Sequence, residues 1–454
     1  MANIAQKPNT WNLAYLPNVW TLGNLGSADR FVLIVVINGQ EIATFKQPQN
    51  PAGVAHFDIS RVLQSYLGTA YVENTFQLAE TPGAALSYQV KFGSETNGNV
   101  LIDGTEPEQY VLNGYDNWRV LNWDYVDYIP YANVDIRCEF FQTNALFTRT
   151  YEYLTNWPTT DADGLKLFKV RSDEYRTLSF FNRYYNFNDG TLWGPNEGPF
   201  FVEYAYYTAN GALLAKDIIT IDSLSGMPVR TDCADLNSHA YTDPQIIATV
   251  GVGPQNIKDS STYWTNAAKT YTVKVYSYNN CWSIDPISDC GDTSLLEEYK
   301  GDLIYGARFE INDACSPFEP INVSFMNRFG VKDYYTFDRR NTYTTAIERS
   351  TYSKMLGSWS QSDFNIDPTG RGRTAFNTNG TTVMQLSTNW MTDAESQWLE
   401  ELYMSPSVMI YLNGVWEPVV VTSNAYEQKS YSRDKMFQHT IEVQFANDKQ
   451  SQRG

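Results

Sequence analysis

The most regular pattern in the chain is a pair of strand-like runs separated by Asn-Gly. Residues 31–37, FVLIVVI, form an apolar, β-branched run, and apolar and polar positions alternate over residues 40–46. Asn38-Gly39 stands between them, and both residue types tolerate the positive φ angles of a type I′ turn. The arrangement recurs at Asn210-Gly211 and Asn413-Gly414, with a weaker copy at Asn97-Gly98. These repeats predict a mainly β protein built from several antiparallel β-sandwich or hairpin domains, with a few short helices.

Two segments predict helices. Residues 56–67, HFDISRVLQSYL, predict a short strand that passes into a helix capped by Asp58 or Ser60. Thr392 and Glu395 have the spacing of a capping box, so a second helix is expected to begin near Asp393. Its apolar face is expected to pack on the hairpin at Asn413-Gly414 and on the period-two strand of residues 439–445.

The order of strand patterns and turn-rich stretches predicts the domain organisation. Pro8 and Pro17 interrupt regular structure near the N-terminus, which indicates an extended arm. Residues 350–380 are rich in Ser, Gly, Arg and Asn, as is typical of a loop or linker. The predicted parts are an arm (1–20), a β domain with a short helix (21–115), two further β domains (116–225 and 226–349), the linker (350–380) and a helix-plus-hairpin C-terminal unit (381–454).

Composition and net charge indicate what kind of surface the protein presents. Aromatic residues make up 15% of the 454 residues, including 32 Tyr, and the formal net charge is −18. Abundant Tyr suggests large contact surfaces, although tyrosines facing solvent on sheets would give the same count. The acidic balance argues against specific binding to nucleic-acid phosphates. It suits a conduit through which DNA slides without sticking.

Several targeting and redox features are missing from the sequence. No run of about 18 apolar residues is present, so membrane insertion is not expected. The first 13 residues lack the basic region and apolar core of a signal peptide, which predicts synthesis in a cytoplasm. The five cysteines are scattered, and reduced thiols are favoured over a bond between Cys281 and Cys290.

No catalytic, cofactor-binding or metal site is expected from the motifs. The three histidines, His56, His239 and His439, are isolated, and the loop Asn186–Gly190 has the wrong spacing for calcium. A glycosidase-like carboxylate pair, or sugar stacking on Trp193, Trp264 or Trp282, is allowed by the sequence but not indicated by any pattern. Local cationic clusters and one aromatic residue are the candidate assembly contacts to neighbouring subunits: Arg339, Arg340, Arg371, Arg373 and Trp398.

Three segments together resemble a known class of proteins. They are residues 30–67, residues 315–340 (CSPFEPINVSFMNRFGVKDYYTFDRR) and residues 398–429 (WLEELYMSPSVMIYLNGVWEPVVVTSNAYEQK). They are similar in kind and order to structural proteins of tailed bacteriophages that infect Bacteroidetes, the crAss-like phages included. The resemblance implies a non-enzymatic ring subunit of the virion tail or head-to-tail connection that assists DNA ejection. It implies a cyclic homo-oligomer, twelve-fold by first choice and six-fold otherwise, in contact with other tail or connector proteins.

Two other functions fit the residues less fully. A receptor- or glycan-binding tail adaptor, or a cell-surface β-sandwich protein, would expose Trp and Tyr in a shallow groove. A glycan-degrading enzyme would need two carboxylates about 5–10 Å apart in a cleft.

Overall fold

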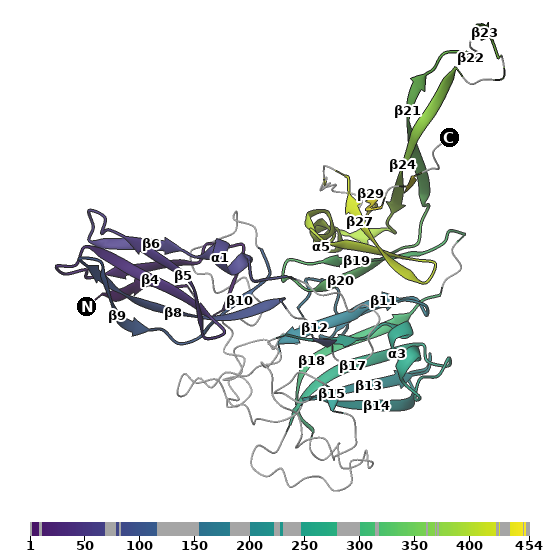
Figure 1. Cartoon of the computed structure of the whole chain (residues 1–454). Coiled ribbons are helices and arrows are strands. Elements are labelled where there is room, and N and C mark those ends of the chain that lie inside the picture. Colours follow the sequence, from purple (N-terminus) through teal and green to yellow (C-terminus); the bar gives the residue numbers. More distant parts are fainter. Residues whose placement is uncertain are drawn as a thin grey trace. The chain divides into compact units, whose positions relative to one another are not determined.

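The computed structural model describes most of the chain, and its strands and helices are labelled in Figure 1. The residues described are 2–8, 11–68, 79–80, 83–115, 154–181, 200–221, 228–229, 247–278, 300–313, 317–359, 362–367, 369, 372–423, 426, 436–447 and 449–450. The protein is mainly β, as the sequence predicts. It divides into two compact units, Met1–Asp313 with Met326–Asp333, and Ala314–Phe325 with Tyr334–Gly454.

The first part of unit 1 is a β-sandwich. One sheet has the order β1 (Asn3–Gln6), β3 (Val19–Gly23), β6 (Val54–Asp58). The other has the order β2 (Trp11–Leu13), β10 (Gln109–Leu112), β8 (Ala85–Thr96), β4 (Arg30–Ile37), β5 (Gln40–Gln47), with β9 (Asn99–Thr105) also paired to β8. Trp20 and Phe57 from the first sheet and Phe31 and Tyr88 from the second belong to one buried core. Helix α1 (Ser60–Gln64) adds Leu63 to it.

The Asn-Gly corners form as predicted in three hairpins. Asn38, Asn97 and Asn413 have φ angles of 52°, 50° and 51°, and each following glycine also has positive φ. The corner at Asn210-Gly211 differs, because only Gly211 has positive φ. There the Gly211 amide donates to the Thr208 carbonyl at 3.0 Å, and the register shifts after Tyr206. A longer loop with glycine in the left-handed conformation therefore joins these strands.

The second part of unit 1 is built on another six-stranded sheet. Its order is β11 (Lys166–Val170), β18 (Lys300–Ile311), β17 (Thr270–Tyr278), β13 (Phe200–Tyr207), β14 (Leu213–Ile221), β15 (Pro228–Val229). A three-stranded sheet has the order β12 (Thr177–Phe181), β16 (Ile247–Gly251), β7 (Ala79–Glu80), and helix α3 spans Pro254–Ser260. Tyr204 and Tyr271 are fully buried, and their hydroxyls donate to the carbonyls of Gly251 and Val252. Part of the abundant tyrosine thus fills the core.

Unit 2 is an eight-stranded sheet with a helix. The sheet order is β20 (Lys332–Phe337), β19 (Ile321–Met326), β26 (Val408–Leu412), β27 (Val415–Val421), β29 (Thr440–Phe445), β24 (Arg373–Ser387), β21 (Thr342–Ser353), with β30 (Lys449–Gln450) paired to β24. Two short pairs join β22 (Ser358–Trp359) to β23 (Phe364–Asn365) and β25 (Met391–Thr392) to β28 (Met436–Phe437). Helix α5 (Asp393–Met404) begins with the predicted capping box of Thr392 and Glu395. Its Trp398 ring lies 5.3 Å from the ring of Phe325 on β19, a strand that was not among its predicted partners. Ser396 of the helix contacts His439, at the start of the predicted partner segment 439–445.

Several predicted boundaries are wrong. Residues 1–20 are not a free arm, because β1 pairs with β3 and β2 pairs with β10, and Leu13 and Leu16 are buried. A boundary at 225/226 would cut the sheet in which β13 pairs with β17. The unit boundary nearest the predicted 349/350 falls between Asp333 and Tyr334 instead. The N-cap position of helix α1 is Ile59, which makes no side-chain capping hydrogen bond. The Asp58 carboxylate, one of the two predicted caps, accepts from the Ser60 amide at 3.0 Å.

The predicted linker of residues 350–380 contains strand. The end of β21 and the start of β24 fall inside this range and pair with each other, from Ser350↔Asn377 to Ser353↔Arg373. The polar composition that indicates a loop also occurs in a strand pair with no covering layer, since no face of such a pair needs apolar residues.

Candidate interaction surface

The most exposed regular element of unit 2 is the ribbon, defined here as residues 342–387. Figure 1 shows β21 and the first part of β24 running beyond the other strands of their sheet as a two-stranded hairpin. All twelve residues of β21 are exposed. β21 is the last strand in the sheet order, so among the described residues its outer edge has no strand partner.

The residues of the ribbon explain its regularity. β21, TYTTAIERSTYS, is rich in the β-branched and aromatic types that favour strands. Thr345 and Thr382 face each other across the pair, with their hydroxyl oxygens 3.3 Å apart. The register shifts at Ser350/Thr351, where Phe376 becomes an extra residue on β24, and its ring lies 6.3 Å from that of Tyr352. Such a bulge bends a strand and increases its twist.

The outer edge of β21 lacks the usual protection against pairing. Edge strands in soluble proteins are commonly short, or carry Lys or Pro. β21 has twelve residues, no Lys and no Pro, and Glu348 and Arg349 are its charged residues. Tyr343 and Ile347, which share a face of the strand, are each 52% exposed. The edge is therefore ready to accept another strand or an apolar surface.

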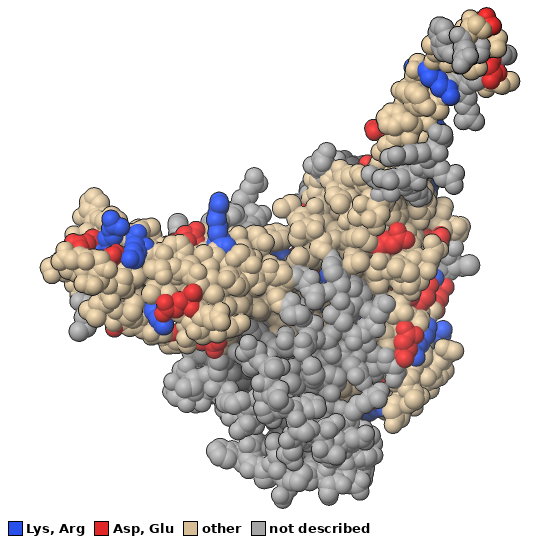
Figure 2. Space-filling model, viewed as in Figure 1, with Lys and Arg blue, Asp and Glu red and all other residues tan. Residues whose placement is uncertain are grey.

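The far end of the ribbon, residues 355–372, is called the tip here, and it exposes several apolar side chains. Met355 is 61% exposed and Ile366 is 72% exposed, and Leu356 and Phe364 are exposed beside them in the chain. Gly357, between β21 and β22, has a φ of 124°, and an added Cβ would collide with the Asn365 carbonyl. This position therefore requires glycine. Lys354 and Arg373 lie just below the tip, where the Lys354 amide donates to the Gly372 carbonyl at 2.7 Å. Figure 2 shows basic side chains on this part of the ribbon and acidic ones at its end.

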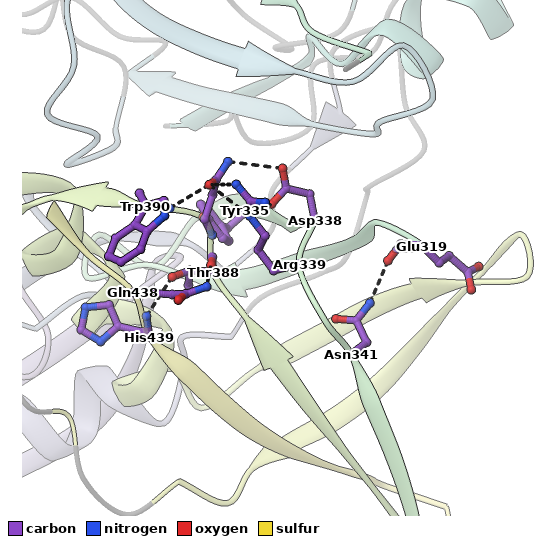
Figure 3. Close-up of polar contacts among 10 residues, drawn as sticks. Glu319, Tyr335, Asp338, Arg339, Asn341, Thr388, Trp390, Gln438 and His439 are labelled. Atoms are coloured by element: carbon purple, nitrogen blue, oxygen red, sulfur yellow. Dashed lines mark hydrogen bonds and ion pairs between the residues drawn. The ribbon is translucent and has the colours of Figure 1, made fainter. Parts of the chain in front are cut away.

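Polar contacts hold the base of the ribbon, where the chain enters β21 and where it leaves β24 (Figure 3). The Asn389 side-chain oxygen accepts from Arg339 Nε and Nη2 at 3.2 and 2.7 Å, and from the Trp390 amide at 2.8 Å. The Asn389 amide group donates to Asp338 Oδ2 at 3.4 Å. On the other strand, Asn341 donates to the Glu319 carbonyl at 2.7 Å. These bonds hold both strand ends against the sheet.

The same network includes a half-buried tyrosine, Tyr335. The Asn389 backbone amide donates to the Tyr335 hydroxyl at 3.2 Å. Burial raises the pKa of Tyr335 well above its ordinary value, with this hydrogen bond acting in the opposite direction. The phenol therefore stays neutral and keeps its place in the network across the physiological pH range.

The structure separates the predicted assembly residues. Arg339 belongs to the network at the base of the ribbon, and Arg340 is exposed next to it. Arg373 is exposed on the ribbon, whereas Arg371 lies outside the described residues. Trp398 is 3% exposed and packs in the core of unit 2, so this residue offers no surface to a partner in the folded chain.

Sequence reasoning missed the residues that make the ribbon a candidate surface, Tyr343, Ile347, Met355 and Ile366. The β-branched and aromatic run of residues 342–353 could have predicted a strand. Its exposure has no local signal, because exposure depends on which elements cover the strand.

Histidine contacts are structural in character. The His56 ring is 2.9 Å from the Thr21 hydroxyl across two paired strands. His439 Nε2 lies 2.7 Å from the hydroxyl of Ser396, a residue of α5 that is 2% exposed. The His439 ring stacks on Tyr426.

Several candidates from the sequence lie outside the described residues: His239, Trp193, Trp282, the loop 186–190 and all five cysteines. Trp264 packs edge-on against Tyr206 and Tyr271.

The described part of the chain offers neither a metal site nor a membrane-spanning helix. No group of three or more His, Cys, Asp or Glu side chains there is placed to hold a metal ion. No helix there has the length and apolar content needed to cross a membrane.

Comparison with known proteins gives no family. No protein-family model and no curated protein sequence matches the chain. Among solved structures, one similar chain comes from a study of host cell surface retention of a 1.5-MDa bacterial ice-binding adhesin. It is 11% identical and the match covers 85% of this chain and 92% of that one, with a TM-score of 0.14. A TM-score this low does not indicate a shared topology, so the likeness supports no function.

Proposed function

We propose that this chain is a bacteriophage virion structural protein, a subunit of a ring in the tail or head-to-tail connection that guides DNA. In this proposal the protein is made in the host cytoplasm, acts without catalysis and works by shape and assembly. Copies of the chain form a closed ring, with twelve-fold symmetry as the first choice and six-fold as the alternative. Other tail or connector proteins would contact the ring above and below.

The observation that carries the proposal is the ribbon. An isolated two-stranded hairpin is at best marginally stable in water, and exposed apolar patches of this kind usually mark an interaction site. The ribbon is such a hairpin beyond Glu348 and Asn379, because β24 pairs there with β21 alone among the described strands. It also has an apolar tip. Insertion of a strand edge into a neighbouring protein satisfies the edge hydrogen bonds and buries the side chains together.

Charge supports assembly with further copies of the chain. The ribbon carries four basic residues, Arg349, Lys354, Arg371 and Arg373, and three acidic ones, Glu348, Asp363 and Asp367. Its net charge is therefore +1, which leaves −19 on the rest of a chain of net charge −18. A nearly neutral, apolar element can approach an acidic neighbour more easily than an acidic element can, because the repulsion is absent.

The test is a variant with a shortened ribbon. Residues 349–378 are replaced by Asn-Gly, which joins Glu348 to Asn379, two residues that face each other in the register. The pairing of β30 with Asn379 and Gly380 is retained. We expect the wild-type chain to form discrete rings, seen by sedimentation velocity and electron microscopy. We expect the variant to remain monomeric, with a circular dichroism spectrum that is still typical of a mainly β fold.

A wild-type chain that stays monomeric at high concentration, alone and with its virion partners, would contradict the proposal. Rings of unchanged size from the shortened variant would contradict the role of the ribbon.

A glycan- or receptor-binding tail adaptor is the second candidate, and one observation favours it. Trp390 is 57% exposed at the base of the ribbon, and an exposed Trp can stack on a sugar ring. This candidate predicts binding to a glycan array that is lost in Trp390→Ala. The ring proposal predicts no such binding.

A further inference from the structure

A second exposed apolar strand lies in unit 1, on the edge strand β9. Val100, Leu101 and Ile102 are consecutive in β9 and are 42%, 63% and 40% exposed. These three residues are called the β9 strip here. β9 pairs with β8 on one side, and among the described residues no strand pairs with its other side. Leu101 points to one face of the sheet and Val100 and Ile102 point to the other, so the strip is an edge with apolar side chains on both faces that the described part of the chain leaves open.

The surroundings of the β9 strip are acidic. Residues 95–108 contain four carboxylates, Glu95, Asp103, Glu106 and Glu108, and no basic residue. Glu95 lies directly opposite Val100 in the register. Lys46 contacts Glu95 at 3.2 Å and Lys7 contacts Glu106 at 2.6 Å, which offsets two of the four charges. A net negative rim remains around the apolar strip.

The tip of the ribbon carries the opposite net charge. Met355, Leu356 and Ile366 are exposed apolar residues. Residues 354–373 contain three cations, Lys354, Arg371 and Arg373, and two carboxylates, Asp363 and Asp367, so their net charge is +1. An apolar strip with a net negative rim and an apolar tip of net positive charge are complementary in both hydrophobicity and charge.

We propose that the ribbon tip of one copy docks on the β9 strip of the next copy. This inference rests on the proposed function and adds the identity of the acceptor surface. Two different surfaces of the chain meet in such a contact, so it is heterologous, and a heterologous contact generates a ring when its rotation closes. A lipid surface would also accept an apolar tip, but the net charge of −18 opposes approach to an anionic membrane.

The direct test is a charge pair placed across the proposed contact. Leu101→Lys and Ile366→Glu each place a charge on one side of the apolar contact, and we expect each alone to weaken assembly at least tenfold in sedimentation velocity. Combined in one chain, the two substitutions place the introduced lysine of one copy opposite the introduced glutamate of the next, and assembly is expected to recover. Leu213→Lys is the matched control, because Leu213 is 51% exposed in unit 1 on the different strand β14.

The outcomes separate this inference from the proposed function. If shortening the ribbon abolishes assembly but Leu101→Lys has no more effect than Leu213→Lys, the acceptor lies elsewhere and the inference is wrong while the ring proposal stands. If Leu213→Lys combined with Ile366→Glu recovers assembly as well as the Leu101 pair does, the inference is also wrong. A wild-type chain that never assembles overturns both. Flotation of the wild-type chain with phosphatidylcholine vesicles, lost in Ile366→Glu, would assign the tip to lipid and overturn the docking on β9.

A crosslink between separate chains gives an independent readout. Leu101→Cys and Ile366→Cys are made in different chains, mixed and treated with a short bis-maleimide. We expect a covalent dimer in the mixture that exceeds the product of each variant alone and of the wild-type chain, whose native cysteines set the background. If the mixture gives no more covalent dimer than each variant alone, the result contradicts the contact.

Discussion

β4 and β21 are strands of opposite environment, and both are rich in β-branched and aromatic residues. β4, RFVLIVVI, is buried at every position after Arg30, whereas β21, TYTTAIERSTYS, is exposed at all twelve positions. β4 has β5 on one side and β8 on the other, and both of its faces are covered. β21 pairs with β24 alone among the described strands. The β-branched and aromatic residues thus explain why both segments are strands. The apolar side chains of β4 and its two partner strands explain why it is core, whereas β21 is more polar and has one described partner.

The largest expected effect comes from the buried member of this comparison. Phe31→Ala in β4 removes a ring that is 0% exposed and leaves a cavity in the sandwich. We expect it to lower the free energy of unfolding by about 3–5 kcal/mol. Denaturant titration followed by circular dichroism measures this. A loss below about 1 kcal/mol would contradict the description of β4 as core, since surface substitutions fall in that range.

The network at the base of the ribbon should have the next largest effect. Asn389→Ala removes the acceptor of Arg339 and of the Trp390 amide, and leaves Asp338 without the Asn389 donor. We expect a loss of about 1–3 kcal/mol in stability, because partly buried groups lose their hydrogen bonds. Asn341→Ala, which removes one exposed hydrogen bond to the Glu319 carbonyl, is the control and should cost less. Equal losses in the two variants would show that the network does not anchor the ribbon.

A smaller effect is expected at the start of α5. Thr392→Ala removes the hydroxyl that accepts from the Glu395 amide at 3.3 Å. Loss of such a cap costs about 1 kcal/mol. Thr392→Ser keeps the hydroxyl and should retain most of the stability in the same thermal melt. Equal melting temperatures for the Ala and Ser variants would contradict the role of the cap.

The smallest effect on stability should come from the exposed strand. Ile347→Ala in β21 changes a side chain that is 52% exposed, so the isolated chain should lose no more than about 0.5 kcal/mol. Ring assembly should weaken, because the same side chain is buried by a neighbour in our proposal. A large loss of stability in the monomer would show that Ile347 is already covered within one chain.

The sequence predicts local features of the fold well. Asn38-Gly39, Asn97-Gly98 and Asn413-Gly414 form corners because their positive φ angles depend on the two residues themselves. Thr392 and Glu395 likewise cap α5 through contacts within one turn. The sheet partners of β1 and β13 could not be predicted, because they depend on segments distant in the chain. The ribbon was missed for a related reason, since its polar composition is that of a loop and its strand character comes from pairing with β24.

For the candidate surface, the sequence indicated the region but not the chemistry. Arg339, Arg340 and Arg373 do lie at or on the ribbon. Arg339 is engaged with Asn389, and the exposed apolar residues Tyr343, Ile347 and Ile366 carry the proposed contact. Trp398 was the clearest misassignment, because an aromatic residue on an amphipathic helix usually faces the core, and here it does.

Hydrogen–deuterium exchange of β21 is the most direct test of the central proposal that the ribbon is completed by a neighbouring copy. In the isolated chain, the β21 amides that point away from β24 should exchange rapidly, because the described chain gives them no partner. We predict that these amides exchange at least ten times more slowly in the assembled ring, while the buried amides of β4 do not change. Equal exchange of β21 in the monomer and in the ring would contradict the account.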